Sequence, residues 1–317
     1  MTRFSVAIPS YNSADFLGET LESILSQTVV PAEVVVVDDG STDGTAAVLA
    51  SFASRVTSIR IDNSGPGFAR KAAIERCTSE WIALCDSDDV WLANHLERKA
   101  RIIHNAPEIE LVFSNFDSFG PGALDSHTLV DEAPSGWLDA YCVPNGPDAC
   151  YRLEDAFRGL LYFNIAYTSG MVFNRQLYTR SGGIRAHVSR WQAEDAEFTR
   201  RLALAAGEHG AFDTTITWRY RRHDKNYSTQ HEYSNIEAGT RILEYLLGND
   251  DIPRHYGAEV LREIIARRRN SFMSAYWAGA DRDALAIFRR LPLRQQSVGL
   301  ILRACHSLLR RTLDHTS

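Results

Sequence analysis

The chain has 317 residues, 44% of them hydrophobic, which is enough for one large domain or two smaller ones. Its formal net charge of −6 argues against a nucleic-acid-binding protein, and no apolar run approaches the length of a membrane-spanning helix. The charge is uneven, because residues 254–317 contain twelve Arg and five acids, a balance of +7, so that the first 253 residues carry −13.

The cysteines and the first residues predict a cellular location. The five Cys are an odd number without a CxxC pair, and Cys85 lies inside an apolar segment, a pattern typical of reduced thiols. Residues 4–8 form an apolar segment that is too short for the core of a signal peptide. We therefore expect a cytoplasmic protein.

Apolar strand-like segments alternate with helical periodicity along the first part of the chain. The expected strands are 4–8, 33–37, 56–61 and 81–85, and the expected helices are 16–25, 46–52 and 69–76. Later segments predict strands over 111–116 and 216–220, a strand that enters from a polar turn within 168–173, and helices over 97–103, 237–247, 258–278, 283–290 and 295–314. The β-α-β-α order predicts an α/β fold with a mostly parallel sheet flanked by helices. The carboxyl ends of such strands open onto a ligand crevice.

Three carboxylates, Asp86, Asp88 and Asp89, follow the segment 81–85. Carboxylates this close repel one another unless a cation lies between them, and their hard oxygens suit Mg²⁺ or Mn²⁺. An acidic turn that caps the next helix explains this stretch alone equally well. The loop 63–71 contains two glycines and two cations, which could bind an anion or simply form a turn.

Four motifs then occur in order: Ile8-Pro9-Ser10-Tyr11-Asn12, residues 37–45, residues 65–70 and Asp86-Ser87-Asp88-Asp89. In this combination the chain resembles the family 2 glycosyltransferases, which are inverting enzymes that use nucleotide sugars. The resemblance covers about the first 115 residues closely. It implies the GT-A fold, a Rossmann-like and mostly parallel sheet flanked by helices, here with a helical C-terminal extension.

The resemblance implies roles for residues that would bind the nucleotide. Pro9, Tyr11 and Asp39 would line the nucleoside pocket, with Asp39 accepting a hydrogen bond from the base as in uridine-binding members. Arg70 would reach the base or the diphosphate. The alternative for Asp39 is an acid that caps a turn.

The resemblance also implies a site for a divalent metal, Mn²⁺ or Mg²⁺. Asp86 and Asp88 would form the DXD pair, with Asp88 as the direct metal ligand and Asp86 nearer the ribose. The metal would neutralise the charge that develops on the leaving diphosphate. His223 would join the metal or diphosphate shell, and Arg221 or Arg222 would hold phosphate. A single His is also commonly a hydrogen-bonded loop residue.

Glu194 and Asp195 lie at the predicted start of a helix whose apolar face includes Phe198 and Leu202. The helix dipole stabilises carboxylates there, so the spacing alone favours a cap without a chemical role. The family resemblance implies instead that this pair supplies the general base. Asp195 would take the proton of the acceptor hydroxyl, and Glu194 is the alternative.

We expect three regions. Residues 1–115 form the nucleotide-sugar-binding half, 116–232 the acceptor-binding half of the same catalytic domain, and 233–317 a helical extension. Within 295–314, six apolar residues share one helical face, with Arg303, Arg310 and Arg311 opposite. This pattern suits peripheral contact with the inner face of an anionic membrane, and it equally suits a helix docked on the catalytic domain.

The resulting prediction is a metal-dependent, inverting glycosyltransferase of the hexosyltransferase type (EC 2.4). Its donor would be a nucleotide sugar, with a UDP-sugar favoured by the resemblance, and its acceptor a hydroxyl of a glycan or lipid-linked glycan in cell-surface polysaccharide synthesis. One alternative is a sugar-phosphate nucleotidyltransferase, although a Gly-rich basic loop is missing after the first strand. The other is a non-catalytic module that binds nucleotide sugars.

Overall fold

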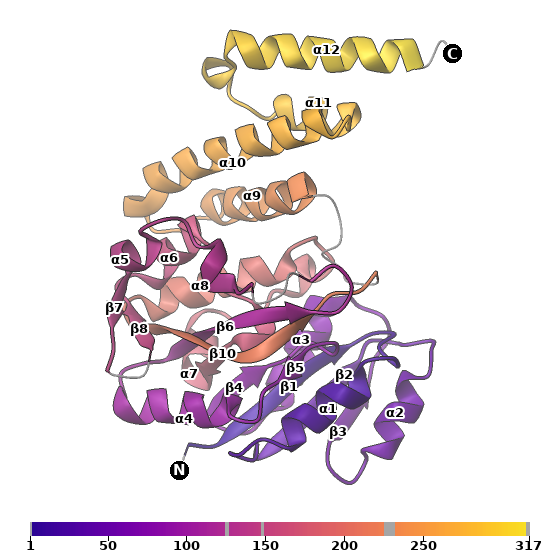
Figure 1. Cartoon of the computed structure of the whole chain (residues 1–317), viewed down its shortest axis with the longest axis vertical. Helices are drawn as coiled ribbons and strands as arrows, with labels where there is room; N and C mark the ends of the chain where they lie inside the picture. The colour runs from indigo at the N-terminus through magenta and orange to yellow at the C-terminus, as the bar shows by residue number, and fades with distance from the viewer. Residues whose placement is uncertain (1, 124–126, 147–148, 225–231, 315–317) are drawn as a thin grey trace. The chain divides into compact units, whose positions relative to one another are not determined.

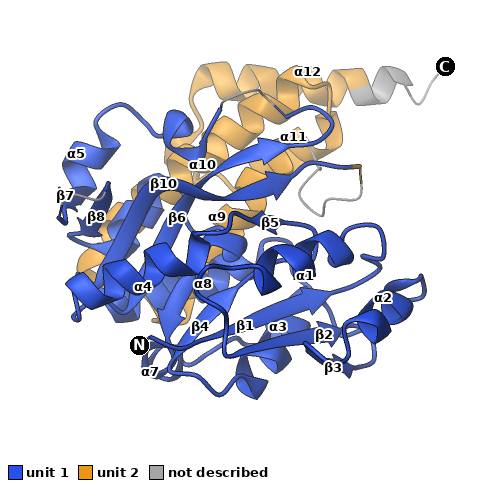
Figure 2. Cartoon of the chain, turned by 60° about the horizontal axis from the view of Figure 1, so that its bottom comes forward, with its two compact units in different colours: residues 1–223 blue, residues 224–317 orange. Residues whose placement is uncertain are grey.

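The computed structural model describes residues 2–123, 127–146, 149–224 and 232–314. The chain forms two compact units, Met1–His223 and Asp224–Ser317, which are coloured separately in Figure 2. We call them unit 1 and unit 2. The predicted division at residues 115 and 232 stays a prediction.

Unit 1 is an α/β structure built on one mixed sheet (Figure 1). Its strands are β1 (Phe4–Ser10), β2 (Glu33–Asp38), β3 (Thr57–Arg60), β4 (Trp81–Leu84), β5 (Val90–Trp91), β6 (Leu111–Phe119), β7 (Cys142–Pro144), β8 (Cys150–Leu153), β9 (Val172–Asn174) and β10 (Gly210–Arg221). Their order is β3-β2-β1-β4-β9-β6-β10-β8-β7, and β5 pairs with β10. The pairs β1–β2, β2–β3, β1–β4 and β6–β10 are parallel.

Eight helices surround this sheet within the described part of unit 1. They are α1 (Leu17–Leu25), α2 (Thr45–Ser51), α3 (Pro66–Arg76), α4 (His95–Asn105), α5 (Trp137–Tyr141), α6 (Ala156–Tyr162), α7 (Arg175–Arg180) and α8 (Glu194–Ala206). Helix α3 packs against β1 and β2, where Ala69 and Ala73 are fully buried and allow a close approach. The consecutive Val34–Val37 of β2 are buried as well, as expected for a central parallel strand.

The segment 168–173, predicted as a strand entered from a polar turn, contains both elements. Residues Thr168–Gly170 form a 3₁₀ turn, and β9 begins only at Val172. The turn forms because the Thr168 and Ser169 hydroxyls donate hydrogen bonds to carboxylates of the Asp86–Asp89 loop. Gly170 also lies so close to Trp218 that a Cβ atom would be 2.3 Å from the indole nitrogen.

A buried ion cluster ties α4 to β10. The carboxylate of Asp213 accepts hydrogen bonds from Lys99 Nζ (3.1 Å) and Arg98 Nη2 (2.8 Å), and the side chains of Lys99 and Asp213 have no exposed surface. Although burial opposes the charge, Lys99 and Arg98 lower the pKa of Asp213. Its stabilising effect is therefore present above the ordinary carboxyl pKa and lost as the pH falls through the lowered value.

We expect Asp213→Asn to lower the free energy of unfolding by about 3–5 kcal/mol, because it leaves the Lys99 charge buried without its partner. Urea denaturation at neutral pH measures this loss. Glu22→Gln removes one partner of an exposed ion pair with Arg55 and should change the stability little. Equal losses in the two variants would contradict this role of Asp213.

Unit 2 consists of the predicted helices: α9 (Glu232–Gly248), α10 (Gly257–Trp277), α11 (Asp281–Phe288) and α12 (Val298–Asp314). Helix α10 packs against α9 and α11, and α11 packs against α12. Their shared core includes Phe272, Ala284 and Leu300. Within the described ranges of the chain, no helix is both long enough and apolar enough to cross a membrane. The cytoplasmic location stays a prediction.

Candidate functional site

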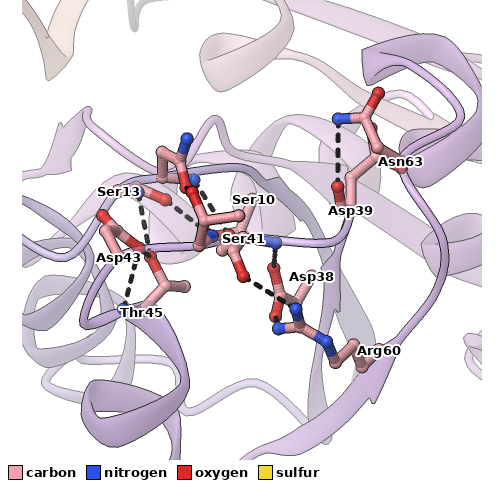
Figure 3. A network of polar contacts seen from close by, with 11 residues as sticks. Ser10, Ser13, Asp38, Asp39, Ser41, Asp43, Thr45, Arg60 and Asn63 are labelled. Carbon is pink, nitrogen blue, oxygen red and sulfur yellow. Dashed lines mark hydrogen bonds and ion pairs between the residues drawn. The ribbon is translucent and has the colours of Figure 1, made fainter.

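Asp39 follows β2 and shapes the glycine loop that precedes α3. Its buried carboxylate accepts hydrogen bonds from the main-chain nitrogens of Ser64 (2.6 Å) and Gly65 (2.9 Å). The side chain of Asn63 donates to the Asp39 carbonyl oxygen (Figure 3). The structure thus shows a positioning role for Asp39, and its contact with a nucleobase stays a prediction.

Asp38 and the residues after it join β1, β2 and β3 (Figure 3). The Asp38 carboxylate accepts hydrogen bonds from Arg60 of β3 (2.5 Å) and from the main-chain nitrogen of Ser41 (2.9 Å). The Ser41 hydroxyl in turn accepts from the nitrogen of Asn12, at the end of β1. These bonds hold the loops after β1 and β2 together at one edge of the sheet.

The two predicted nucleoside residues on this edge differ in exposure. Pro9 is buried within β1, and its contact with a nucleoside stays a prediction. Tyr11 is 51% exposed, so its ring can contact a bound molecule. Asn12 has a left-handed φ of 48° and accepts a hydrogen bond from the Thr42 nitrogen (2.8 Å). Such a conformation is held only where surrounding contacts fix it.

The glycine loop fits closely against the segment before α8. A Cβ atom on Gly65 would lie 2.8 Å from the Ser189 carbonyl oxygen, and one on Gly67 would lie 2.9 Å from the Glu194 side chain. Gly65 also has a φ of 96°, which only glycine adopts readily. These two positions therefore need glycine so that α3 can approach the start of α8.

Arg70 of α3 joins the two acidic motifs. Its buried guanidinium donates hydrogen bonds to Glu194 Oε1 (2.5 Å) and to Asp86 Oδ1 (3.1 Å). Although burial opposes the charge, Asp86, Glu194 and Asp195 raise the pKa of Arg70, so this cation is permanent. The structure thus brings together three predicted site residues that lie far apart in the sequence.

Thr168 and Ser169 support the acidic loop from the 3₁₀ turn. Thr168 donates to the second oxygen of Asp86 (2.5 Å), so both oxygens of this carboxylate have protein partners. Ser169 accepts from the Asp86 nitrogen (2.9 Å) and donates to Asp89 (2.5 Å). Burial, together with Asp88 and Asp86, raises the pKa of Asp89. Asp89 also accepts a hydrogen bond from the Arg221 nitrogen (2.9 Å), so its two carboxylate oxygens join the loop to β10 and to the 3₁₀ turn.

Asp88 pairs with His223. The His223 Nε2 atom lies 3.0 Å from Asp88 Oδ2, and the imidazole stacks on Phe16 with ring centroids 4.3 Å apart. Burial and the neighbouring Asp86 raise the pKa of Asp88. In the described residues, no three His, Cys, Asp or Glu are grouped to hold a metal. One carboxylate and one imidazole fit a divalent cation that takes its other ligands from a substrate.

The two predicted phosphate-binding arginines differ in their surroundings. Arg221 lies over the Phe119 ring at 4.4 Å and donates to the Asp88 carbonyl oxygen (2.7 Å) and to Glu19 (2.6 Å). Arg221 therefore fixes the loop that carries Asp88. Arg222 follows it at the end of β10 and is exposed, so its guanidinium can reach a ligand more easily.

Glu194 and Asp195 begin α8, directly after Ala193, which has a left-handed φ of 61°. Burial, opposed by Arg70, raises the pKa of Glu194 to about 7. Burial also raises the pKa of Asp195, whose side chain remains partly exposed and accepts a hydrogen bond from the Ala196 nitrogen (2.9 Å). The two carboxylates therefore sit in an environment that favours proton transfer near neutral pH.

A buried ion pair between Glu197 and Arg201 joins α8 to the loop before it. Glu197 is fully buried and accepts two hydrogen bonds of 2.7 Å from Arg201, which also donates to the Gly183 carbonyl oxygen (2.6 Å). Sequence analysis missed Glu197 and Arg201. The sequence shows opposite charges four positions apart at Glu197 and Arg201. Such pairs usually lie on the exposed side of a helix, so the spacing did not indicate a buried ion pair.

Comparison with known proteins identifies glycosyltransferases as relatives of this chain. Residues 5–130 match the family model Glycosyl transferase family 2. The chain is 38% identical over 99 residues to the putative teichuronic acid biosynthesis glycosyltransferase TuaG of Bacillus subtilis, a match that covers 30% of this chain and 39% of TuaG. It is 46% identical over 93 residues to the succinoglycan biosynthesis protein ExoO of Rhizobium meliloti, covering 29% of this chain and 27% of ExoO. The matched parts thus span less than half of either relative.

Solved structures share the fold over nearly the whole chain. S. aureus TarS 1-349 in complex with UDP-GlcNAc superimposes with a TM-score of 0.67 at 18% identity, covering 96% of this chain and 89% of that one. The mannosyltransferase PcManGT from Pyrobaculum calidifontis, in complex with GDP-Man and Mn²⁺, gives 0.59 at 19% identity, covering 97% and 80%. The predicted GT-A fold is confirmed, and the match of residues 5–130 to the family model agrees with the predicted resemblance to glycosyltransferase family 2.

Proposed function

We propose that this protein transfers a sugar from a nucleotide sugar to a hydroxyl group of a glycan or lipid-linked glycan, in the synthesis of a cell-surface polysaccharide. The observation that carries the proposal is the pair of bonds from Arg70 to Asp86 and Glu194, because it joins the family's donor motif to its base motif. The biosynthetic roles in the names of TuaG and ExoO support the acceptor class.

The donor lies across the edge of the sheet where β1, β2 and β4 end. Tyr11 contacts the nucleoside, and Asp39 accepts a hydrogen bond from the base with the lone pairs that its two main-chain partners leave open. We favour a UDP-sugar, because the fold is shared with TarS, whose structure contains UDP-GlcNAc. GDP-Man in PcManGT makes a GDP-sugar the alternative.

The diphosphate is held on the side of Asp88. Asp88 and His223 would ligate Mn²⁺ or Mg²⁺, with Asp86 close by, and the imidazole favours Mn²⁺. When bound, this cation neutralises the charge that develops on the leaving diphosphate. Arg221 fixes the Asp88 loop through its hydrogen bond to the Asp88 carbonyl oxygen. The exposed Arg222 binds the phosphate.

Proton transfer occurs at the start of α8. Asp195 takes the proton of the acceptor hydroxyl, whose oxygen attacks the anomeric carbon from the face opposite the leaving diphosphate, so that the configuration inverts. Arg70 keeps Glu194 in place beside Asp195 and limits the repulsion among the three nearby carboxylates. The raised pKa of Asp195 makes it a stronger base than an exposed carboxylate.

We expect Asp88→Asn to slow sugar transfer about a hundredfold or more, because one of the two protein ligands of the cation is weakened. The release of nucleoside diphosphate is measured while Mn²⁺ is titrated, and the variant should need more Mn²⁺ for half-maximal rate. Asp139→Asn removes an exposed carboxylate on α5 and serves as the control. An unchanged Mn²⁺ dependence in Asp88→Asn would contradict the metal role of Asp88.

A further inference from the structure

Tyr167 directly precedes the 3₁₀ turn that supports the acidic loop. Its neighbour Thr168 donates a hydrogen bond to Asp86 (2.5 Å), so the backbone of Tyr167 is fixed relative to that loop. The Tyr167 side chain is half-buried, and within the described ranges its hydroxyl group has no hydrogen-bond partner. This hydroxyl can therefore donate a hydrogen bond to a molecule that enters the site.

The Tyr167 ring belongs to an aromatic wall, by which we mean the side chains of Phe116, Tyr167 and Tyr220. The Tyr167 ring centroid lies 4.7 Å from that of Phe116 in an edge-to-face contact and 6.4 Å from that of Tyr220. Phe116 of β6 is in register with Trp218 of the adjacent β10, and Tyr220 follows on the same face of the sheet (Figure 1). Phe116 and Trp218 are buried, whereas Tyr167 and Tyr220 are only half-buried.

Two carboxylates lie near the Tyr167 hydroxyl. Burial and the carboxylate of Glu132 raise the pKa of Tyr167. Tyr220 and Asp195 raise this pKa further, and Arg222 opposes the effect. Tyr167 therefore keeps its proton at neutral pH and remains a hydrogen-bond donor. Asp195 is the residue that we propose as the base, so the aromatic wall lies beside the place where the acceptor hydroxyl must be.

The 3₁₀ turn Leu129–Glu132 holds the second of these carboxylates beside β6. Asn115 of β6 accepts a hydrogen bond from the Val130 nitrogen through its side-chain oxygen (3.1 Å). The Glu132 side chain is 47% exposed and lies 3.5 Å from His127. Because an exposed ion pair of this kind contributes little, the Glu132 carboxylate can accept a hydrogen bond from a ligand hydroxyl instead.

The strand order places the aromatic wall on the acceptor side of the site. The residues proposed to contact the nucleoside follow β1 and β2, whereas the wall is built on β6 and β10, beyond β4 and β9 in the sheet. The acceptor attacks from the face opposite the leaving diphosphate, so it approaches from the side away from the nucleoside. A partly exposed aromatic surface with a few polar groups suits a sugar ring, which offers C–H groups on its face and hydroxyls at its edge.

We propose that Tyr167 binds the terminal sugar ring of the acceptor. The ring of Tyr167 packs against one face of this sugar, and its hydroxyl donates a hydrogen bond to a sugar oxygen. Glu132 accepts a hydrogen bond from another hydroxyl of the same sugar, and the hydroxyl that reacts is directed toward Asp195. This inference rests on the proposed function and specifies its substrate class, an acceptor that ends in an uncharged sugar ring.

The test measures nucleoside diphosphate release by the full chain while an acceptor is titrated. The probe is a mixture of oligosaccharides prepared from the cell-surface glycans of the organism that makes the protein, and the donor is the nucleotide sugar that the wild-type chain uses fastest. Tyr167→Ala should raise the half-saturating concentration of the probe about tenfold or more, because packing surface and a hydrogen bond are lost. Tyr167→Phe and Glu132→Gln should each raise it about two- to tenfold, the effect of one hydrogen bond.

Two further measurements make the test specific for the acceptor. In Tyr167→Phe, the affinity for the intact nucleotide sugar and the slow release without acceptor should change by no more than about twofold. Tyr151 is the matched control, because it is also half-buried but lies opposite Phe212, near the start of β10. Tyr151→Phe should leave the half-saturating concentration unchanged. Circular dichroism checks the fold, and Tyr167→Phe keeps the packing of the ring.

Wild-type transfer together with an unchanged half-saturating concentration in Tyr167→Ala and Tyr167→Phe would overturn this inference and leave the proposed function intact. A weaker affinity for the intact nucleotide sugar, without an effect on the acceptor, would also overturn it, because Tyr167 would then bind the donor sugar. A wild-type chain that neither binds nucleotide nor releases it from any donor would contradict the proposed function itself, and this inference with it.

Discussion

Asp195→Asn should lower kcat for sugar transfer by about 10²- to 10⁴-fold with little change in the affinity for the nucleotide. The substitution keeps the shape of the side chain but removes the group that accepts the proton of the acceptor hydroxyl. Acceptor-dependent release of nucleoside diphosphate measures the rate, and titration with UDP measures nucleotide binding.

Glu194→Gln is the matched control for Asp195→Asn. Glu194 is bonded to Arg70 at 2.5 Å, so its neutralisation should disturb the position of α8 and reduce the rate less than loss of the base does. The reverse order of the two effects would identify Glu194 as the base. Full activity of Asp195→Asn would contradict general-base catalysis by this pair.

The pH dependence of the wild-type rate follows from the same pair. Burial raises the pKa of Glu194 to about 7 and raises that of Asp195 above its ordinary value. The pair therefore takes up a proton as the pH falls below about 7, and the rate of transfer should fall over this range. In Asp195→Asn this acid limb should become much shallower.

Arg70→Gln should affect both stability and activity. The substitution leaves the carboxylates of Glu194 and Asp86 close together without their shared cation, which we expect to lower the free energy of unfolding by about 3–5 kcal/mol. Sugar transfer should be lost nearly completely, because α8 and the Asp86 loop are no longer joined. Urea denaturation and the transfer assay measure the two effects.

Two control variants make the Arg70 prediction specific. Arg70→Lys keeps the charge but cannot donate to two carboxylates with a planar group, so it should recover part of the stability and little activity. Arg55→Gln removes the cation of an exposed pair and should change neither quantity much. Wild-type stability and activity in Arg70→Gln would show that the bridge has no role.

Local patterns in the sequence predicted most strands and helices of both units, but they did not predict β5, β7, β8, α5, α6 and α7. The apolar segments that became β1, β2 and β4 are each followed by polar residues, and parallel strands bring their carboxyl ends to one edge. The spacing of apolar residues in α12 likewise predicted one apolar face, although it did not show that this face is exposed.

Contacts between distant residues could not be predicted from such patterns. Arg70 and Glu194 are 124 positions apart, and they meet because Gly65 and Gly67 allow α3 to approach α8. The polar turn at Thr168–Gly170 was predicted, but its hydrogen bonds to the acidic loop were not, because they span about eighty positions and leave no local period. Only the Thr and Ser within an otherwise apolar segment hinted at this role.

The most direct test of the proposed function is nucleoside diphosphate release by the purified chain. The donors are UDP-, GDP- and dTDP-sugars, each with and without Mn²⁺, in the presence of glycan acceptors. We expect Mn²⁺-dependent release from one donor, a UDP-sugar, and its loss in Asp88→Asn. No release from any donor, together with no detectable nucleotide binding, would contradict a glycosyltransferase that uses nucleotide sugars.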